Sequence, residues 1–257
     1  MEPVYDLDAG AGDPAKKVLS AAYLGWSGIC VVQSFDAGYR DFLSALGAAG
    51  KVSQIEVFAG AMITAEKPQE VEKKARAALE AGADIVLVAG GDPEINRAAS
   101  ECWEVDILCH PEKVSGRDLP DQKNSGLDHV MAGYMAERCM AIEINFSELL
   151  YSYGMVRSQM MGRMRQNVML AKKYDVPLII ASGGDAFSLR APEDLYSVCI
   201  TLGMDAGFAK KVLAENPSRM VKKARDRKDP NVLMKGVSIV SRPDGEPSKR
   251  KKMSGWY

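Results

Sequence analysis

Carboxylates and a histidine follow several apolar segments of this chain, at positions where a catalytic barrel carries its chemistry. Asp6 and Asp8 flank Leu7 in the first segment, Glu143 lies in a later one, and His110 directly follows VDILC. Carboxylate oxygens are ligands that Mg²⁺ prefers. A divalent cation held by such side chains activates water for attack on a phosphate ester. One interpretation is therefore a metal-dependent phosphoesterase that uses Asp6, Asp8 and His110.

The supply of metal ligands argues against that chemistry. The chain has 2 histidines, His110 and His129, and 5 cysteines without a CxxC pair. A catalytic ion lowers the pKa of its bound water only when several side chains hold it firmly. We therefore expect no catalytic residue, no metal site and no bound cofactor in the protein. The cysteines are expected to be reduced, buried thiols.

Phosphate recognition is a second chemistry that the residue types allow. Gly90 and Gly91 precede Asp92 and Pro93, which have the pattern of a helix N-cap followed by a first-turn proline. Backbone N–H groups at such a helix start can meet a phosphate. The alternative is that the glycines only form the sharp turn from strand to helix.

Residues 109–130, CHPEKVSGRDLPDQKNSGLDHV, are the most distinctive segment of the chain. Three cations, Lys113, Arg117 and Lys123, precede a helix for which Asn124 or Ser125 is the predicted N-cap. Loop cations beside a helix N-terminus form a phosphate cradle.

An alternation of apolar strands and amphipathic helices must hold these segments in place. The predicted strands are residues 4–8, 28–34, 54–63, 84–91, 105–110, 141–147 and 177–184. Several are apolar on both faces, as in a parallel sheet covered on both sides. The pattern favours an α/β fold, a TIM-like (β/α) barrel that is seven-stranded or irregularly closed, although an open sheet is compatible with it.

The C-terminal part of the chain differs in charge from the rest. Residues 201–257 carry 14 Lys and Arg against 6 Asp and Glu, whereas residues 1–100 carry 9 against 14. We predict a barrel domain over 1–230 and a C-terminal extension over 231–257, with a late strand at 236–242 and a basic, disordered tail. Such a segment can engage a polyanion, or it can be only solvated.

The chain shows no signal for membranes or secretion. No apolar run approaches the roughly 20 residues that a membrane span needs, and the acidic N-terminus differs from a signal peptide. A cytoplasmic protein without membrane contact is expected.

Several blocks, taken in order, resemble the family of ribonuclease P protein component 3, of the archaeal type. They are VYDLD, VDILCHPE, KNSGLDHV, AIEINFSELLYS with the basic helix after it, DVPLIIASGG, LRAPEDL and LAENPSRMV. The resemblance implies a protein subunit of ribonuclease P, the ribonucleoprotein endoribonuclease that removes the 5′ leader of precursor tRNA. It further implies that the RNA subunit catalyses hydrolysis with Mg²⁺. The implied partners are that RNA, a small ferredoxin-like protein subunit and precursor tRNA.

This family is in turn similar to the polymerase and histidinol phosphatase superfamily of metal-dependent phosphoesterases. Where those enzymes carry a His-x-His pair on the first strand, this chain has Asp6-Leu7-Asp8. The resemblance therefore implies a barrel that supports RNA and does not catalyse hydrolysis by itself.

Three groups of residues are predicted to bind RNA. Positions matched to the family are His110, Lys123, Asn124, Ser125, His129 and Arg190. Helix patterns and charge add Arg157, Arg163, Arg165, Lys222, Lys223, Arg225, Arg227 and Lys228, and the tail adds Lys249, Arg250, Lys251 and Lys252. The loop before Lys123 is longer than the family pattern, so no role is carried over to Lys113 or Arg117. The alternative is a structural module whose protein partner makes the RNA contacts.

Overall fold

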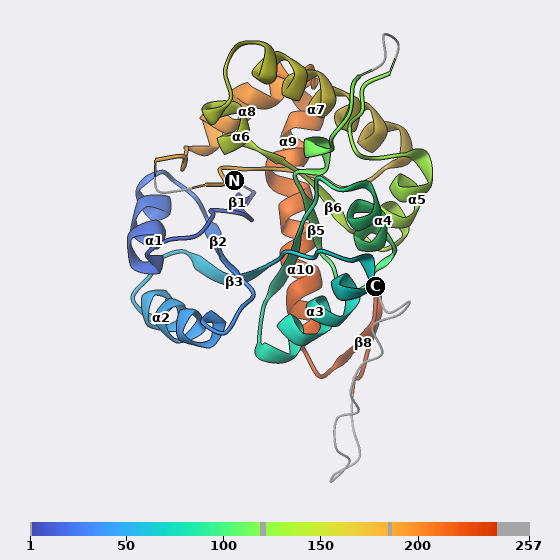
Figure 1. The fold of residues 1–257 in the computed structure, drawn as a ribbon. Helices are drawn as coiled ribbons and strands as arrows, with labels where there is room; N and C mark the ends of the chain where they lie inside the picture. The colour runs from blue at the N-terminus through green and yellow to red at the C-terminus, as the bar shows by residue number, and fades with distance from the viewer. Residues whose placement is uncertain (1, 119–121, 185–186, 241–257) are drawn as a thin grey trace.

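Seven short parallel strands follow one another around a barrel in chain order (Figure 1). In this computed structural model, residues 2–118, 122–184 and 187–240 are described. The strands are β1 (Tyr5–Asp6), β2 (Gly28–Ser34), β3 (Glu56–Ile63), β4 (Ile85–Ala89), β5 (Ile107–Cys109), β6 (Ala141–Asn145) and β7 (Leu178–Ala181). Each pairs in parallel with the next. The predicted seven-stranded (β/α) barrel is confirmed.

The first and last strands meet through isolated hydrogen bonds just beyond their ends instead of a regular ladder. Ser182 N lies 3.2 Å from a carboxylate oxygen of Asp6, and Gly183 N donates to the carbonyl of Asp8 over 2.8 Å. Among the described residues, β1 and β7 share no strand pairing. The barrel is therefore nearly closed, and Asp6 is part of its seam.

Helices cover the outside of the barrel. They are α1 (Pro14–Tyr23), α2 (Tyr39–Lys51), α3 (Pro68–Ala81), α4 (Pro93–Glu101), α5 (His129–Glu137), α6 (Phe146–Tyr151), α7 (Gly154–Tyr174), α8 (Pro192–Thr201), α9 (Ala206–Lys210) and α10 (Asn216–Lys228). A 3₁₀ turn (Pro111–Lys113) follows β5, and a π-helical turn (Lys211–Glu215) precedes α10. Asp92 caps α4, and Gly82 ends α3 with φ 110°.

The predicted N-cap of α5 was wrong. Asp128 caps this helix, since its carboxylate accepts from Met131 N over 2.8 Å. The side chain of Asn124 instead donates to the carbonyl of Ser115 over 3.1 Å. The loop thus continues to Asp128, because Asn124 closes a turn within it.

Two apolar layers form the core. One lies between the strands and the outer helices; the other fills the barrel with side chains such as Leu7, Ile107 and Ile179. All five cysteines are buried and free, as predicted. Burial on both faces explains why the strands are apolar on both sides.

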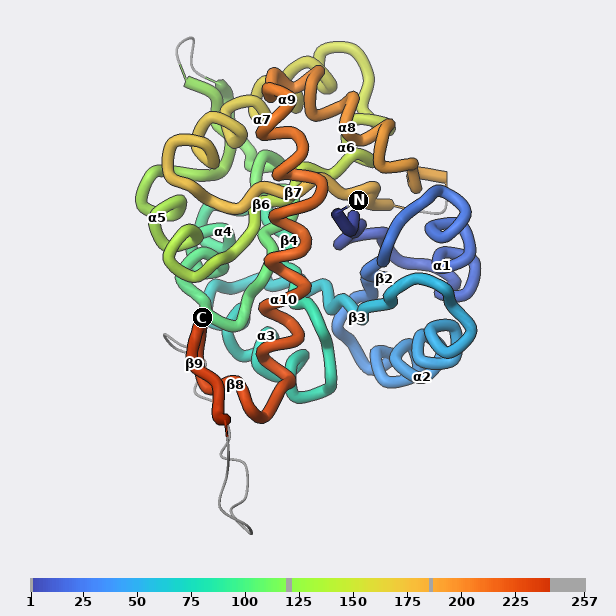
Figure 2. The backbone as a smooth tube through the Cα atoms, turned by 180° about the vertical axis from the view of Figure 1, so that it is seen from behind, coloured from blue at the N-terminus to red at the C-terminus, as the bar shows by residue number. Residues whose placement is uncertain are grey.

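Helix α10 lies across one end of the barrel, as Figure 2 shows from behind. Met220, Val221 and Ala224 join the apolar cluster of the barrel interior. Asn216 Nδ2 donates to the carbonyl of Leu178, the first residue of β7, over 2.8 Å. The amino ends of the strands are therefore closed by a helix that holds apolar residues toward the barrel.

A small hairpin follows α10, outside the barrel sheet. It joins β8 (Val232–Met234) to β9 (Val237–Ser238), so the predicted late strand begins as expected but is shorter. Its end, at 241–242, and the tail cations Lys249, Arg250, Lys251 and Lys252 lie outside the described residues. In the part of the chain that is described, no helix combines the length and apolar character of a membrane span.

Candidate RNA interface

The barrel separates the predicted cations into two sets. The cations of α10 lie at the amino ends of the strands, where they contact Glu56, Asp84 and Asp106. His110, Lys123 and Arg190 lie in loops that follow the carboxyl ends of β5 and β7. Loops at the carboxyl ends of barrel strands usually build the functional site.

Lys223 and Arg227 hold the fold together instead of presenting charge to solvent. Lys223 is 1% exposed, and its Nζ lies 3.2 Å from Asp106 Oδ1 and 3.1 Å from the carbonyl of Arg138. Arg227, with a side chain 7% exposed, also pairs with Asp106. The prediction of RNA contacts at these two residues is corrected, because buried charges require partners inside the fold.

The carboxylate of Asp106 is the centre of this cluster. Burial favours its neutral form, but the charges of Arg227 and Lys223 outweigh burial and hold its pKa below the usual value. Burial in turn lowers the pKa of Lys223. Asp106 also accepts from Val86 N over 3.0 Å, so the cluster fixes β4, β5 and α10 together.

The remaining cations of α10 are at its surface. Arg225 pairs with Glu56 and Lys228 with Asp84, in both cases with exposed cationic side chains. Lys222 is exposed and makes no ion pair within the described part of the chain. Pairing with strand-end acids thus accounts for most of the basic character of α10.

Arg163 on α7 has a structural role that its charge alone did not reveal. Its guanidinium donates to the carbonyls of Glu112, Val114 and Gly116 over 2.8–2.9 Å, and to Asp118 Oδ1 over 2.9 Å. The residue is 6% exposed. The predicted RNA contact is corrected: Arg163 fastens the loop over 110–118 to α7.

Asn96 on α4 fastens the same loop from the other side. Its Nδ2 donates to the carbonyls of Pro111 (3.2 Å) and Gly126 (2.9 Å), and its Oδ1 accepts from Gly91 N. Gly90 N donates to the carbonyl of Cys109 over 2.8 Å. The phosphate interpretation of the two glycines is therefore wrong, since both N–H groups are used within the fold.

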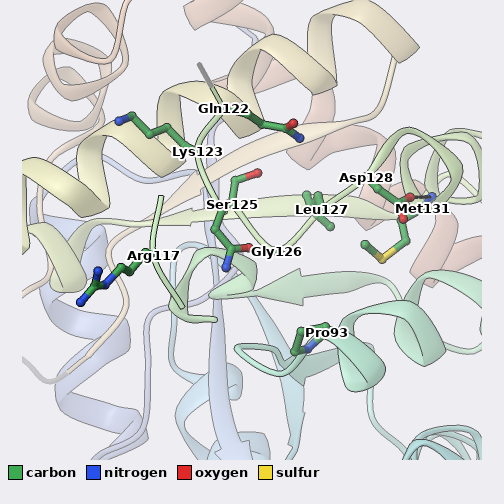
Figure 3. A pocket seen from close by; sticks show the side chains of 10 residues that line it. Pro93, Arg117, Gln122, Lys123, Ser125, Gly126, Leu127, Asp128 and Met131 are labelled. Atoms are coloured by element: carbon green, nitrogen blue, oxygen red, sulfur yellow. Dashed lines mark hydrogen bonds between the residues drawn. The ribbon is translucent and has the colours of Figure 1, made fainter. Parts of the chain in front are cut away.

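The loop that Arg163 and Asn96 hold in place borders a cavity of about 510 Å³ (Figure 3). Its lining is Pro93, Arg117, Gln122, Lys123, Asn124, Ser125, Gly126, Leu127, Asp128 and Met131. Three predicted RNA-binding residues, Lys123, Asn124 and Ser125, thus come together at one cavity. Ser125 is 2% exposed, so only its neighbours present side chains to solvent. His129 is exposed at the first turn of α5.

The other predicted cations lie along α7 and after β7. Arg157 donates to the carbonyls of Ser152 and Leu150, and Arg165, which is exposed, donates to the carbonyl of Thr201. Arg190 fastens the turn after β7 through the carbonyls of Phe187 and Leu189. All three guanidinium groups thus donate hydrogen bonds to backbone carbonyls, and Arg165 is the most exposed of the three.

Carboxyl groups gather inside the carboxyl end of the barrel. Asp8, Cys109 and Glu143 place their potential ligand atoms within 4.8 Å of one another. Burial and the nearby charge of Asp8 raise the pKa of Glu143, and burial raises the pKa of Asp6 to about 7. Burial therefore favours the neutral forms of Glu143 and Asp6.

A catalytic divalent cation does not fit these residues. The donor set mixes two carboxylates with a thiol, whereas Mg²⁺ takes oxygen ligands. Asp8, Cys109 and Glu143 are 3%, 0% and 1% exposed and so are shielded from solvent, whereas a catalytic metal site keeps a position open to water or substrate. We derive no catalytic step through a metal at this cluster.

His110 directly follows β5 and has a left-handed backbone conformation, with φ 52°. Its Nδ1 is 3.8 Å from Glu148 Oε1, which Lys113 Nζ contacts at 2.7 Å. Burial lowers the pKa of His110. Burial thus favours the neutral ring, and Lys113 is engaged within the fold.

Glu112 is a buried acid whose carboxylate oxygens have no hydrogen-bond partner among the described residues. The side chain is 1% exposed, and burial raises its pKa to about 7. Between about pH 4 and 7 the folded chain thus holds a proton that the unfolded chain has released. The free energy of unfolding falls as the pH rises through this range.

Glu112→Gln removes this titration. We expect the variant to be more stable than the wild type by about 3 kcal/mol at pH 7.5 and by less than about 1 kcal/mol at pH 5. Urea unfolding at both pH values measures the difference. Glu94→Gln, at an exposed position of α4, is the control and should show no such pH dependence. Equal stabilisation by Glu112→Gln at both pH values would contradict a buried, protonated Glu112.

Sequence reasoning missed several residues that build the site. Lys17 on α1 is 2% exposed, and its Nζ donates to the carbonyls of Ala9 and Gly184. Asn96 holds the loop to α4, but the sequence alone indicates no role for it beyond a place in the helix that starts at Pro93. Most of their partners are backbone carbonyls distant in sequence, so no local sequence pattern predicts these contacts.

The fold and the site together define a class of protein. It is a (β/α) barrel with buried acids inside the carboxyl ends of its strands, and beside them lies a cationic loop that hydrogen bonds hold to α4 and α7. Against families of known proteins, residues 4–229 match the family of ribonuclease P subunit p30. The chain belongs to this family.

Curated relatives are archaeal proteins named ribonuclease P protein component 3. The one from Methanococcus maripaludis is 32% identical over 241 residues, with 93% of this chain and 99% of the relative covered. The one from Methanosarcina mazei is 31% identical, with 94% and 95% covered. The likeness therefore spans the whole barrel.

Solved structures agree. A chain in a cryo-EM structure of archaeal ribonuclease P with mature tRNA superposes with a TM-score of 0.78 at 30% identity, covering 94% of this chain and 100% of that one. A probable 2-pyrone-4,6-dicarboxylic acid hydrolase from Acinetobacter baumannii reaches a TM-score of 0.52 at 13% identity. The second match shows a shared fold alone.

Proposed function

We propose that this chain is a protein subunit of ribonuclease P that supports the catalytic RNA in removing the 5′ leader of precursor tRNA. The observation that carries the proposal is the likeness, over nearly the whole chain, to a subunit of an archaeal ribonuclease P solved with mature tRNA. The protein contributes to an endoribonuclease as part of a ribonucleoprotein, with ribonuclease P RNA and precursor tRNA as its nucleic-acid partners.

Catalysis in this proposal belongs to the RNA. Burial raises the pKa of both Asp6 and Glu143, and these acids are closed off from solvent, which makes the barrel a poor site for a reacting water. In this proposal the chain binds no cofactor of its own, and the Mg²⁺ of the reaction is held by the RNA subunit.

The RNA side of the protein, in this proposal, is the loop end of the barrel. Lys123 and the exposed Arg165 supply positive charge there and have no carboxylate partner among the described residues, and His129 is exposed at the start of α5. At the opposite end, strand-end acids neutralise most cations of α10. Since phosphate contacts provide most of the affinity for RNA, the end with unneutralised cations is favoured.

A second surface suits the small ferredoxin-like protein subunit. Between α6 and α7, Tyr151, Tyr153, Met155 and Val156 are 52%, 72%, 85% and 61% exposed. A contiguous exposed apolar surface is typical of protein–protein contact. We place the protein partner on this connection, beside the RNA-binding loop end of the barrel.

Reconstitution tests the proposed function. Cleavage of precursor tRNA by the RNA subunit is measured with and without this chain, each with the small protein partner, at limiting Mg²⁺. We expect the chain to accelerate 5′ leader removal and to lower the Mg²⁺ concentration required. The chain without RNA should cleave nothing. Equal rates with and without the chain would refute a supporting role.

A further inference from the structure

The cavity beside the fastened loop has two chemically different sides. Leu127, Met131 and Pro93 provide apolar surface on one side, and Arg117 and Lys123 extend on the other, as Figure 3 shows. Its volume, about 510 Å³, lies within the roughly 300–1,000 Å³ of small-ligand pockets. A ligand with a flat apolar part and an anionic part matches this division.

Among the described residues, the two cations at the rim have no carboxylate partner. Within the described residues, Arg117 and Lys123 make no ion pair, whereas Lys113 pairs with Glu148 at 2.7 Å. The aliphatic part of Lys123 lies along Gly162 of α7, where an added Cβ would be 3.7 Å from its Cε. Lys123 therefore keeps its ammonium group toward solvent while its stem packs on a helix.

The acid in the lining does not cancel this charge. Asp128 accepts from Met131 N over 2.8 Å, and its other oxygen lies 3.6 Å from Arg97 Nη1. Amide side chains of Gln122 and Asn124 complete the rim and can both donate and accept hydrogen bonds. The cavity thus offers net positive charge and adaptable polar groups around an apolar floor.

The described parts of the loop, residues 110–118 and 122–126, are held in shape before any ligand arrives. Arg163 makes four hydrogen bonds to residues 112–118, and Asn96 bonds the carbonyls of Pro111 and Gly126. A site that is ordered in advance loses less conformational entropy on binding. A cavity fixed on both flanks suits the capture of one defined group.

From this arrangement we propose that the cavity takes a single unpaired nucleotide of the RNA. The base lies against Leu127, Met131 and Pro93, and the phosphate lies near Arg117 and Lys123. Unpaired bases that leave the stack are the parts of RNA that proteins hold in pockets. This inference rests on the proposed function and adds to it which part of the RNA is bound and where.

Crosslinking within the assembled ribonucleoprotein tests the site. The RNA subunit is transcribed with 4-thiouridine, irradiated in the complex, and the attached peptides are identified. We expect a crosslink within residues 117–131. Gln122→Trp, which fills the cavity from its exposed rim without a change in charge, should lower that crosslink about tenfold.

Affinity measurements separate the phosphate contacts. Arg117→Gln with Lys123→Gln should weaken binding of the intact chain to ribonuclease P RNA about tenfold at 0.15 M salt. It should also reduce the slope of log affinity against log salt by about 2. The matched control is Lys51→Gln with Lys73→Gln, exposed lysines of α2 and α3. Thermal melts verify that both double variants are folded.

The outcomes distinguish this site from the proposed function. If the wild-type chain accelerates cleavage but both double variants bind RNA alike, or Gln122→Trp leaves the crosslink unchanged, the nucleotide site is refuted and the subunit role stands. If the chain fails to accelerate cleavage, the subunit role is refuted, and a crosslink at 117–131 still supports the nucleotide site. Loss of protein-partner binding without loss of RNA affinity would assign the cavity to a protein segment and overturn the inference.

Discussion

Asp106→Ala is expected to destabilise the protein by about 3–5 kcal/mol, a large part of the stability of a typical domain. The substitution leaves Lys223 and Arg227 buried without their shared carboxylate, and Val86 N loses its acceptor. Urea unfolding at neutral pH measures the loss. Because the pKa of Asp106 is depressed, its contribution is present above about pH 4 and disappears as the pH falls below that.

Glu56→Ala is the matched control at the same end of the barrel. Its pair with Arg225 is solvent-exposed, with side chains 44% and 57% exposed, so we expect a loss below about 1 kcal/mol. Adding Lys223→Met to Asp106→Ala should recover part of the stability, because one uncompensated charge is removed. Similar losses for Asp106→Ala and Glu56→Ala would show that α10 does not close the barrel through a buried ion cluster.

Arg163→Met is expected to loosen the loop that borders the cavity. Four hydrogen bonds disappear while the apolar stem is retained, and we expect a loss of about 2–4 kcal/mol together with weaker RNA binding. Hydrogen exchange should become faster over residues 112–126, whereas β2 and β3 should keep their protection.

Arg165→Met removes a charge from α7 without releasing the loop that Arg163 holds to the same helix. Arg165 is exposed and makes one bond, to the carbonyl of Thr201, so its loss should change stability by no more than about 0.5 kcal/mol. It should still weaken RNA binding if α7 contributes a phosphate contact. Unchanged exchange in the loop of Arg163→Met would contradict the fastening role assigned to Arg163.

The sequence predicted the barrel well because strand and helix periodicity are local properties. The helix start at Asp92-Pro93 appears in the structure where the residue types place it. The N-cap of α5 escaped prediction, since Asn124 and Asp128 are both good capping residues and only tertiary contacts decide between them.

The distribution of charge along the sequence predicted the site less well than hydrophobic periodicity predicted the fold. The basic C-terminal segment, read as a surface for RNA, contains Lys223 and Arg227, whose partner Asp106 lies more than a hundred residues earlier. Arg163 likewise serves a distant loop. A count of cations cannot distinguish a phosphate contact from a buried pair, because the partner is known only from the fold.

The central claim is that RNA binds the loop end of this barrel while α10 closes the other end. Lysine-reactivity footprinting of the reconstituted ribonucleoprotein tests it most directly, because Lys123 and Lys222 lie at opposite ends. Acetylation of each lysine is compared with and without the RNA subunit. We expect RNA to protect Lys123 and to leave Lys222 and the control Lys73 reactive. Protection of Lys222 with an unchanged Lys123 would contradict the claim.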